Sequence, residues 1–249
     1  MEPTALLIIL AIFIVAVMYS SVGHGGASGY LAVMAFFATV TPEITKPTAL
    51  VLNLFVASIA TYQFWRAGYF SWRIFWPFAA ASIPAAFIGG MISLPTNVYK
   101  IVLGVVLMLA ALRLAWKLTA GIEAKQPNIL IALAIGTVIG LLSGLVGVGG
   151  GIFLTPVLLL ANWAETKTAA GVSAAFILVN SISGLLGNWL LGKGAAVSTL
   201  PTDVWFWIVS AVVGGLLGST LGAKKFDSLT MRRVLAVVLL FAGVKLIFV

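Results

Sequence analysis

The stretch Ser143-Gly144-Leu145-Val146-Gly147-Val148-Gly149-Gly150-Gly151 decides how this chain folds. It lies inside a run of 39 residues, 126–164, that contains no Asp, Glu, Lys or Arg. Such a run is too long for one membrane span of about 20 residues. Three consecutive glycines interrupt a helix, because glycine loses more conformational freedom on folding than any other residue. We therefore predict two helical arms that meet at this cluster.

A second glycine cluster lies at the matching place in the first half of the chain. The segment Ser20-Ser21-Val22-Gly23-His24-Gly25-Gly26-Ala27-Ser28-Gly29 interrupts an uncharged run of 40 residues, 3–42. After each run come a short polar loop, a helix that carries an asparagine (Asn53 or Asn180), and two further apolar segments. Such self-similarity predicts an internal duplication, which decides the architecture of a chain. The further apolar segments are 74–93 and 97–117 in the first half, and 204–223 and 229–249 in the second.

The composition excludes a soluble domain. Of 249 residues, 62% are hydrophobic and 8% are charged, whereas a soluble domain carries about 25% charged residues. We predict an all-α polytopic membrane protein with a single transmembrane domain, 1–249. Repeat 1 covers about 4–117, a linker covers 118–127, and repeat 2 covers about 128–249, with about five membrane segments in each repeat.

Charge and cysteine content exclude several classes of function. A net charge of +8 could indicate nucleic-acid binding, but the basic residues lie singly between apolar runs and are better explained as topogenic charge. Because the chain has no cysteine and one histidine, thiolate and two-histidine metal sites are excluded. We expect no metal, no cofactor and no nucleic-acid partner.

The distribution of basic residues favours an inverted relation between the repeats. If each glycine cluster is the tip of a spanning or re-entrant hairpin, ten basic residues fall on one side of the membrane and four on the other. If each broken run crosses once, the repeats are parallel and the tally is seven against seven. The positive-inside rule favours the inverted arrangement, with both termini outside. The ten are Arg66, Arg73, Arg113, Lys117, Lys125, Lys167, Lys224, Lys225, Arg232 and Arg233, and the four are Lys46, Lys100, Lys193 and Lys245.

The two glycine clusters are candidates for a small-anion site. Bare backbone at membrane depth is tolerated where it lines a cavity, and the first N–H groups of the helix after each cluster have no intrahelical partner. These groups form the positive end of the helix dipole and suit an anion. The alternative is structural, because glycine, serine and asparagine also serve close helix packing and hydrogen bonds between helices. The candidate binding residues are Ser20, Ser21, His24, Gly25, Gly26, Ser28, Asn53, Gly147, Gly149, Gly150, Gly151 and Asn180.

His24 is the only side chain in either cluster that titrates near neutral pH. An intramembrane ionisable group is a functional candidate, so His24 could bind the anion when protonated or couple a proton to transport. The alternative is a neutral histidine with a structural hydrogen bond. No Asp or Glu lies deep in a predicted span, which counts against carboxylate coupling and against an intramembrane enzyme that needs an acid–base pair.

At these residues the chain resembles the sulfite exporter TauE/SafE family of membrane permeases. The resemblance lies in 147–151 with Pro156, in 167–180 with Gly184, and in a weaker first copy at 23–26. It implies transport of sulfite, sulfonates or other small organic anions. The first copy departs from the second, with His24, Ala27 and Ser28 in place of Val148, Gly151 and Ile152.

Together, these observations predict a permease of the inner, or plasma, membrane that moves a small anion by alternating access. Its partners would be the anionic substrate and the lipid bilayer, with a coupling proton and an oligomer both left open. The main alternative is a passive channel for a small solute. An intramembrane enzyme or an assembly subunit is the other.

Overall fold

The computed structural model describes residues 3–37, 42–92, 125–191 and 203–227, together with isolated residues outside these ranges. In the described residues every regular element is a helix, as predicted. The first half contributes α1 (Pro3–Ser21), α2 (Ala27–Phe37), α3 (Pro42–Arg66) and α4 (Trp72–Met91). The second half contributes α6 (Ile129–Val146), α7 (Gly151–Leu160), α8 (Thr166–Leu191), α10 (Val204–Thr220) and a π-helical turn, η1 (Leu221–Lys225).

Six helices in the described ranges are long and apolar enough to cross a membrane, which supports a multi-pass membrane protein. They lie within α1, α3, α4, α6, α8 and α10 with η1. The helices that follow the glycine clusters are different. α2 has 11 residues and α7 has 10, so they are about 16 and 15 Å long, roughly half of the 30 Å hydrocarbon core. Each glycine cluster therefore separates a full-length helix from a half-length one.

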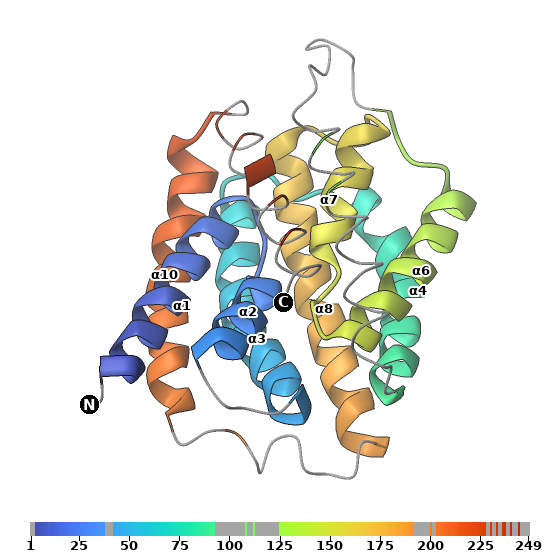
Figure 1. Cartoon of the computed structure of the whole chain (residues 1–249). Coiled ribbons are helices and arrows are strands. Elements are labelled where there is room, and N and C mark those ends of the chain that lie inside the picture. The colour runs from blue at the N-terminus through green and yellow to red at the C-terminus, as the bar shows by residue number, and fades with distance from the viewer. Residues whose placement is uncertain are drawn as a thin grey trace.

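Figure 1 shows the directions of the helices in the two halves. In this view α1 and α3 rise, whereas their sequence counterparts α6 and α8 descend. These are the directions that an inverted arrangement requires. The last predicted segment of each half, 97–117 and 229–249, lies outside the continuous described ranges. The repeat boundaries and the inverted five-segment repeat therefore stay predictions.

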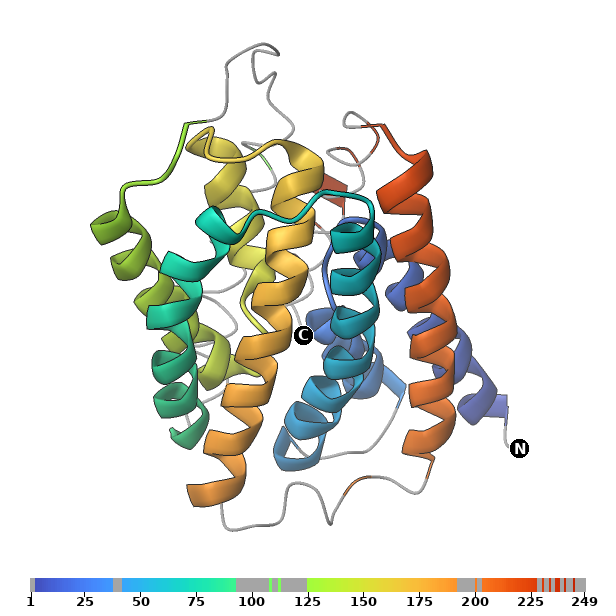
Figure 2. The same ribbon diagram turned by 180° about the vertical axis from the view of Figure 1, so that it is seen from behind.

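The described helices form two bundles, and each bundle takes helices from both halves of the chain. We call α1, α2, α3 and α10 the first bundle, and α4, α6, α7 and α8 the second bundle. Within them, α1 packs on α10 and α4 packs on α6 and α8. The most extensive contact between the bundles is that of α3 with α8 (Figures 1 and 2). Because α4 and α10 cross to the opposite bundle, neither half of the sequence forms a bundle by itself.

Two stripes of glycine hold the crossed helices against their partners. In α6 the stripe faces backbone carbonyls of α4, and from α10 into η1 a second stripe faces backbone carbonyls of α1. A Cβ atom at any stripe position would collide with the backbone of the opposing helix, so the helices approach as closely as small residues allow. The stripes are Gly136, Gly140 and Gly144 against α4, and Gly214, Gly218 and Gly222 against α1.

Serine hydroxyls add hydrogen bonds between helices of the same bundle. The Ser210 hydroxyl on α10 donates to the Ile9 carbonyl on α1 at 2.7 Å. The Ser183 hydroxyl on α8 donates to the Ile83 carbonyl on α4 at 2.5 Å. Large apolar side chains remain exposed on the outer faces, for example Leu130 and Trp205. In a polytopic protein these faces contact lipid.

Candidate functional site

The two glycine clusters form tight turns inside the molecule. In the first, Gly23 and Gly26 have φ angles of 77° and 98°, a left-handed conformation that glycine adopts without steric cost. In the second, Gly147 ends α6 in the left-handed region, and Gly149 and Gly150 both have φ of 79°. Every residue from 20 to 30 and from 146 to 156 is buried. Both turns are therefore internal backbone, as expected where broken helices meet within a membrane protein.

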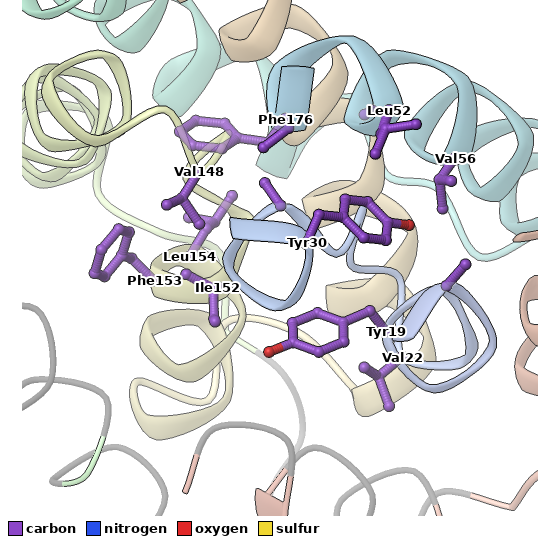
Figure 3. Packing of buried hydrophobic residues seen from close by; sticks show 14 of the residues in the cluster. Tyr19, Val22, Tyr30, Leu52, Val56, Val148, Ile152, Phe153, Leu154 and Phe176 are labelled. Carbon is purple, nitrogen blue, oxygen red and sulfur yellow. The ribbon is translucent and has the colours of Figure 1, made fainter. Parts of the chain in front are cut away.

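A cavity lies where the two turns meet. It is small: about 10 Å³ is open to the centre of a water-sized sphere, roughly the space of one water molecule. Ser28 in the first turn of α2 and Ile152 in the first turn of α7 both line it, so both half-length helices begin at this cavity. In Figure 3 the Tyr19 side chain of α1 points toward Ile152 of α7. The lining residues are Tyr19, His24, Gly25, Gly26, Ala27, Ser28, Val148, Ile152 and Ile177.

Asn53 on α3 joins the two turns behind the cavity. Its Oδ1 accepts a hydrogen bond from the Ala27 N–H at 3.2 Å, which caps the start of α2. Its Nδ2 donates to the Val148 carbonyl of the second turn at 3.4 Å and to the Ser181 hydroxyl of α8 at 3.2 Å. The side chain is fully buried. One amide thus satisfies backbone groups of both turns and links the two bundles.

His24 makes a second link between the bundles. Its Nε2 lies 2.9 Å from the Thr155 hydroxyl on α7. That hydroxyl also lies 2.6 Å from the Ser173 hydroxyl on α8 and 3.1 Å from the Gly151 carbonyl. The His24 side chain is 1% exposed, and its Nδ1 has no hydrogen-bond partner among the residues that the structure describes.

The third polar group of the cavity is a pair of hydroxyls from the first bundle. The Ser28 hydroxyl of α2 donates to the Tyr19 hydroxyl of α1 at 3.2 Å. In Figure 3 the Tyr19 hydroxyl lies on the side of the ring that faces Ile152. Because two hydroxyls share one mutual hydrogen bond, one of their two protons stays free to donate to a ligand.

The structure brings together some of the predicted site residues. Of the twelve, His24, Gly25, Gly26 and Ser28 line the cavity. Asn53 and the glycines Gly147, Gly149, Gly150 and Gly151 do not line it. Asn53 is hydrogen-bonded to both turns, and a Cβ atom at Gly149 would contact Asn53, Ile177 and Ser181.

The remaining three predicted residues point elsewhere. The Ser20 and Ser21 hydroxyls donate to the Val17 and Met18 carbonyls of their own helix. Asn180 donates to the Phe176 carbonyl, also in its own helix, and does not line the cavity. Its place is taken by Ile177, which lines the cavity and lies as far from the start of α8 as Asn53 lies from the start of α3.

Sequence reasoning missed three residues of this region. Tyr19 precedes the first glycine cluster within an apolar stretch, and the available signal was that a buried tyrosine hydroxyl needs a partner. Thr155 lies one turn into α7, just before Pro156. A polar side chain in an otherwise apolar helix was the feature that could have identified it. Ile177 carries no signal at all, because an isoleucine in a membrane helix is ordinary.

The charge of the cavity suits an anion. None of its lining residues is acidic. The first-turn amides of α2 and α7 present the positive ends of two helix dipoles to it. Among the described residues, no group of three or more His, Cys, Asp or Glu side chains could hold a metal ion.

Comparison with known proteins gives the family. The sequence profile described as "Sulfite exporter TauE/SafE" matches residues 8–246. The chain belongs to the TauE/SafE family. This TauE/SafE chain is 38% identical over 254 residues to "Probable membrane transporter protein y4hK" of Sinorhizobium fredii (strain NBRC 101917 / NGR234), with 100% of both chains covered. No solved structure matches it.

More distant bacterial relatives cover the same length. The chain is 25% identical to "Probable membrane transporter protein YunE" of Bacillus subtilis (strain 168), with 92% of each chain covered. It is also 25% identical to "Probable membrane transporter protein YjnA" of the same organism, with 96% of this chain and 98% of the relative covered. With six candidate spans in the described residues, the TauE/SafE protein is a multi-pass transporter of the plasma membrane rather than an enzyme.

Proposed function

We propose that this TauE/SafE protein moves a small sulfur-containing anion, such as sulfite or a sulfonate, through the cavity between the two glycine turns. One observation carries the proposal: both half-length helices begin at the same buried cavity, and no acidic residue lines it. Asn53 accepts from the Ala27 N–H and the Gly150 carbonyl accepts from the Phe153 N–H, so the other first-turn amides, such as those of Ser28 and Ile152, would hold the anionic oxygen atoms. Glycine lets those oxygens approach the backbone closely.

The arrangement of the bundles supports alternating access. The cavity lies between the bundles, because Tyr19, His24 and Ser28 come from the first bundle and Val148, Ile152 and Ile177 come from the second. Among the described helices, the extensive contact between the bundles is that of α3 with α8. A rocking motion of one bundle against the other would therefore open the cavity first to one side of the membrane and then to the other. A coupling proton and an oligomer stay predictions.

Counterflow in proteoliposomes tests this function. Vesicles are loaded with unlabelled sulfite, and labelled sulfite is then added outside at low concentration. A carrier produces transient accumulation of label above equilibrium, because exchange through the carrier is faster than net loss of the internal pool. Simple equilibration would indicate a channel, and absence of flux from folded protein would contradict sulfite transport. Sulfonates and carboxylates added as competitors rank the substrates.

A further inference from the structure

The hydrogen bonds around Thr155 determine which ring nitrogen of His24 carries the proton. The Thr155 hydroxyl has one proton to donate and two lone pairs that accept. It contacts three groups: the Gly151 carbonyl at 3.1 Å, the Ser173 hydroxyl at 2.6 Å and the His24 Nε2 at 2.9 Å. The carbonyl can only accept, so all three contacts are hydrogen bonds only if Thr155 donates to Gly151. Ser173 and the His24 Nε2–H then both donate to Thr155.

A neutral His24 with its proton on Nε2 leaves a bare lone pair on Nδ1. That nitrogen is buried and has no partner in the described residues. His24 lines the cavity, whereas Thr155 does not. The Nε2 edge of the ring therefore faces α7, and Nδ1 is the polar atom left for the cavity. An unpaired buried acceptor is unfavourable unless a water molecule or a ligand donates to it.

The other polar groups of the cavity are hydrogen-bond donors. The Tyr19 and Ser28 hydroxyls share one hydrogen bond and keep one proton free, and the Ser28 N–H is a first-turn amide of α2. These groups suit the oxygens of an anion. The lone pair of Nδ1 does not, because two acceptors repel each other. The cavity thus combines donors for an anionic group with a single acceptor beside them.

We propose that the cavity selects an anion that carries its own O–H donor, which the Nδ1 of His24 accepts. The class includes hydroxyalkyl sulfonates and singly protonated oxyanions such as hydrogen sulfite. This inference rests on the proposed function for the anion site. It adds recognition of the ligand's O–H group, which backbone amides cannot bind because they are donors themselves. Thr155 and Ser173 act as positioning residues, since they hold the imidazole in the required tautomer.

The test compares two sulfonates that differ by one hydroxyl group, 2-hydroxyethanesulfonate and ethanesulfonate. Affinities are measured from the ligand-dependent thermal stabilisation of the purified full-length protein, so the readout does not depend on transport. We expect 2-hydroxyethanesulfonate to bind at least ~10-fold more tightly, the scale of one buried hydrogen bond. Equal affinity, tighter binding of ethanesulfonate, or no stabilisation by either compound would overturn the inference.

Two variants separate the roles of the two ring nitrogens. His24→Gln places an amide where Nε2 lies, so it keeps the contact with Thr155 and loses the Nδ1 acceptor. In this variant the affinities for 2-hydroxyethanesulfonate and ethanesulfonate should differ by no more than about 2-fold. Thr155→Val should weaken the preference by several-fold, and Thr155→Ser should restore it because the hydroxyl returns. If His24→Gln keeps the preference for the hydroxylated compound, the inference is wrong. If neither variant folds, the comparison of the two sulfonates on the wild-type protein is sufficient to test it.

The inference and the proposed function fail in different ways. If sulfite counterflow occurs but the two sulfonates bind equally, the anion pathway stands and the O–H requirement is wrong. If counterflow is absent but 2-hydroxyethanesulfonate binds selectively, the cavity recognises the proposed ligand class and sulfite transport is wrong.

Discussion

Asn53 and Val148 are hydrogen-bonded across the interface of the two bundles, with the Asn53 Nδ2 donating to the Val148 carbonyl at 3.4 Å. The same amide accepts from the Ala27 N–H through Oδ1. An asparagine is suited to this position because it offers a donor and an acceptor on one short side chain. The start of α2 and the second glycine turn are thereby held at a fixed separation.

Replacement of Asn53 by alanine should reduce transport by at least ~10-fold. The change leaves the Ala27 N–H and the Val148 carbonyl without partners, and each unsatisfied buried group costs roughly 1–3 kcal/mol. Initial rates of sulfite counterflow measure the effect. Asn180→Ala is the matched control, because Asn180 is equally buried but, within the described ranges, its side chain donates only to the Phe176 carbonyl of its own helix. Equal losses in the two variants would contradict the bridging role of Asn53.

Replacement of Gly149 by alanine should abolish transport while the protein stays folded in the membrane. The new Cβ atom would meet Asn53 Nδ2 at 2.7 Å and Ile177 and Ser181 at 2.8 Å, so it would disturb the turn that the anion site depends on. Gly68→Ala is the control for backbone strain alone. Gly68 has a similar φ of 82°, but a Cβ atom there would have nothing within 4 Å. Normal counterflow by Gly149→Ala would exclude a site built on this turn.

Replacement of Gly140 by valine should lower the thermal stability rather than the substrate affinity. A side chain there would collide with the backbone at Ser82 of α4. Overpacking of this kind costs about 1–3 kcal/mol, or roughly 2–12 °C for a chain of this length. Thermal unfolding in detergent provides the measurement. Gly184→Ala is the control, because its nearest neighbour would lie at 3.5 Å; a comparable loss there would argue against the glycine stripe as the cause.

The membrane orientation can be checked with single cysteines, since the chain has none of its own. We expect Ser71→Cys, at the end that carries Arg66 and Arg73, to react with a membrane-impermeant maleimide only from the cytoplasm. Asp203→Cys, at the start of α10, should react only from outside. Reaction of both positions from the same side would contradict the inverted arrangement.

Asp227 lies outside the membrane-spanning segments and makes the stability of the folded protein depend on pH. Hydrogen bonds from the Thr230 side chain and backbone N–H hold the pKa of the Asp227 carboxyl below its usual range. A carboxyl whose folded pKa is lowered stabilises the protein above its unfolded pKa of about 3.9, and this contribution disappears as the pH falls through the folded pKa. The melting temperature of Asp227→Asn should therefore lie slightly below that of the wild type at pH 6, and the difference should shrink as the pH falls below about 3.9. A difference that stays constant as the pH is lowered through this range would rule out this origin.

Much of the fold was predictable, because the two glycine clusters interrupt long uncharged runs that contain no other sign of where a helix ends. That a helical arm follows each cluster was predicted from the positions of 25–29 and 149–151 within those runs. That α2 and α7 have only 11 and 10 residues was not predicted. The crossing of α4 and α10 between bundles was not predicted. It depends on close contacts between helices that are distant in the sequence. Glycines such as Gly140 and Gly218 indicate that a helix packs closely, but they do not indicate which helix it packs against.

The candidate site was predictable in its backbone and less so in its side chains. His24 and Ser28 lie within the first cluster, so their presence at the cavity followed from the turn itself. Asn53 and Asn180 were matched by residue type, but the α8 residue that lines the cavity is Ile177. Thr155 was missed because its role depends on a contact with His24, 131 residues away in the sequence.

The exchange of α4 and α10 between bundles constrains how the protein is made. When α4 leaves the ribosome, the helices on which it packs, α6 and α8, have not yet been synthesised. When α1 is already in the bilayer, its partner α10 is still more than 180 residues away. Until then, the surfaces of α1 and α4 that later contact these helices lack their partners in the membrane. Biogenesis of this transporter is thus completed only late in translation, and a truncated chain would present unsatisfied helix surfaces to the quality-control proteases of the membrane.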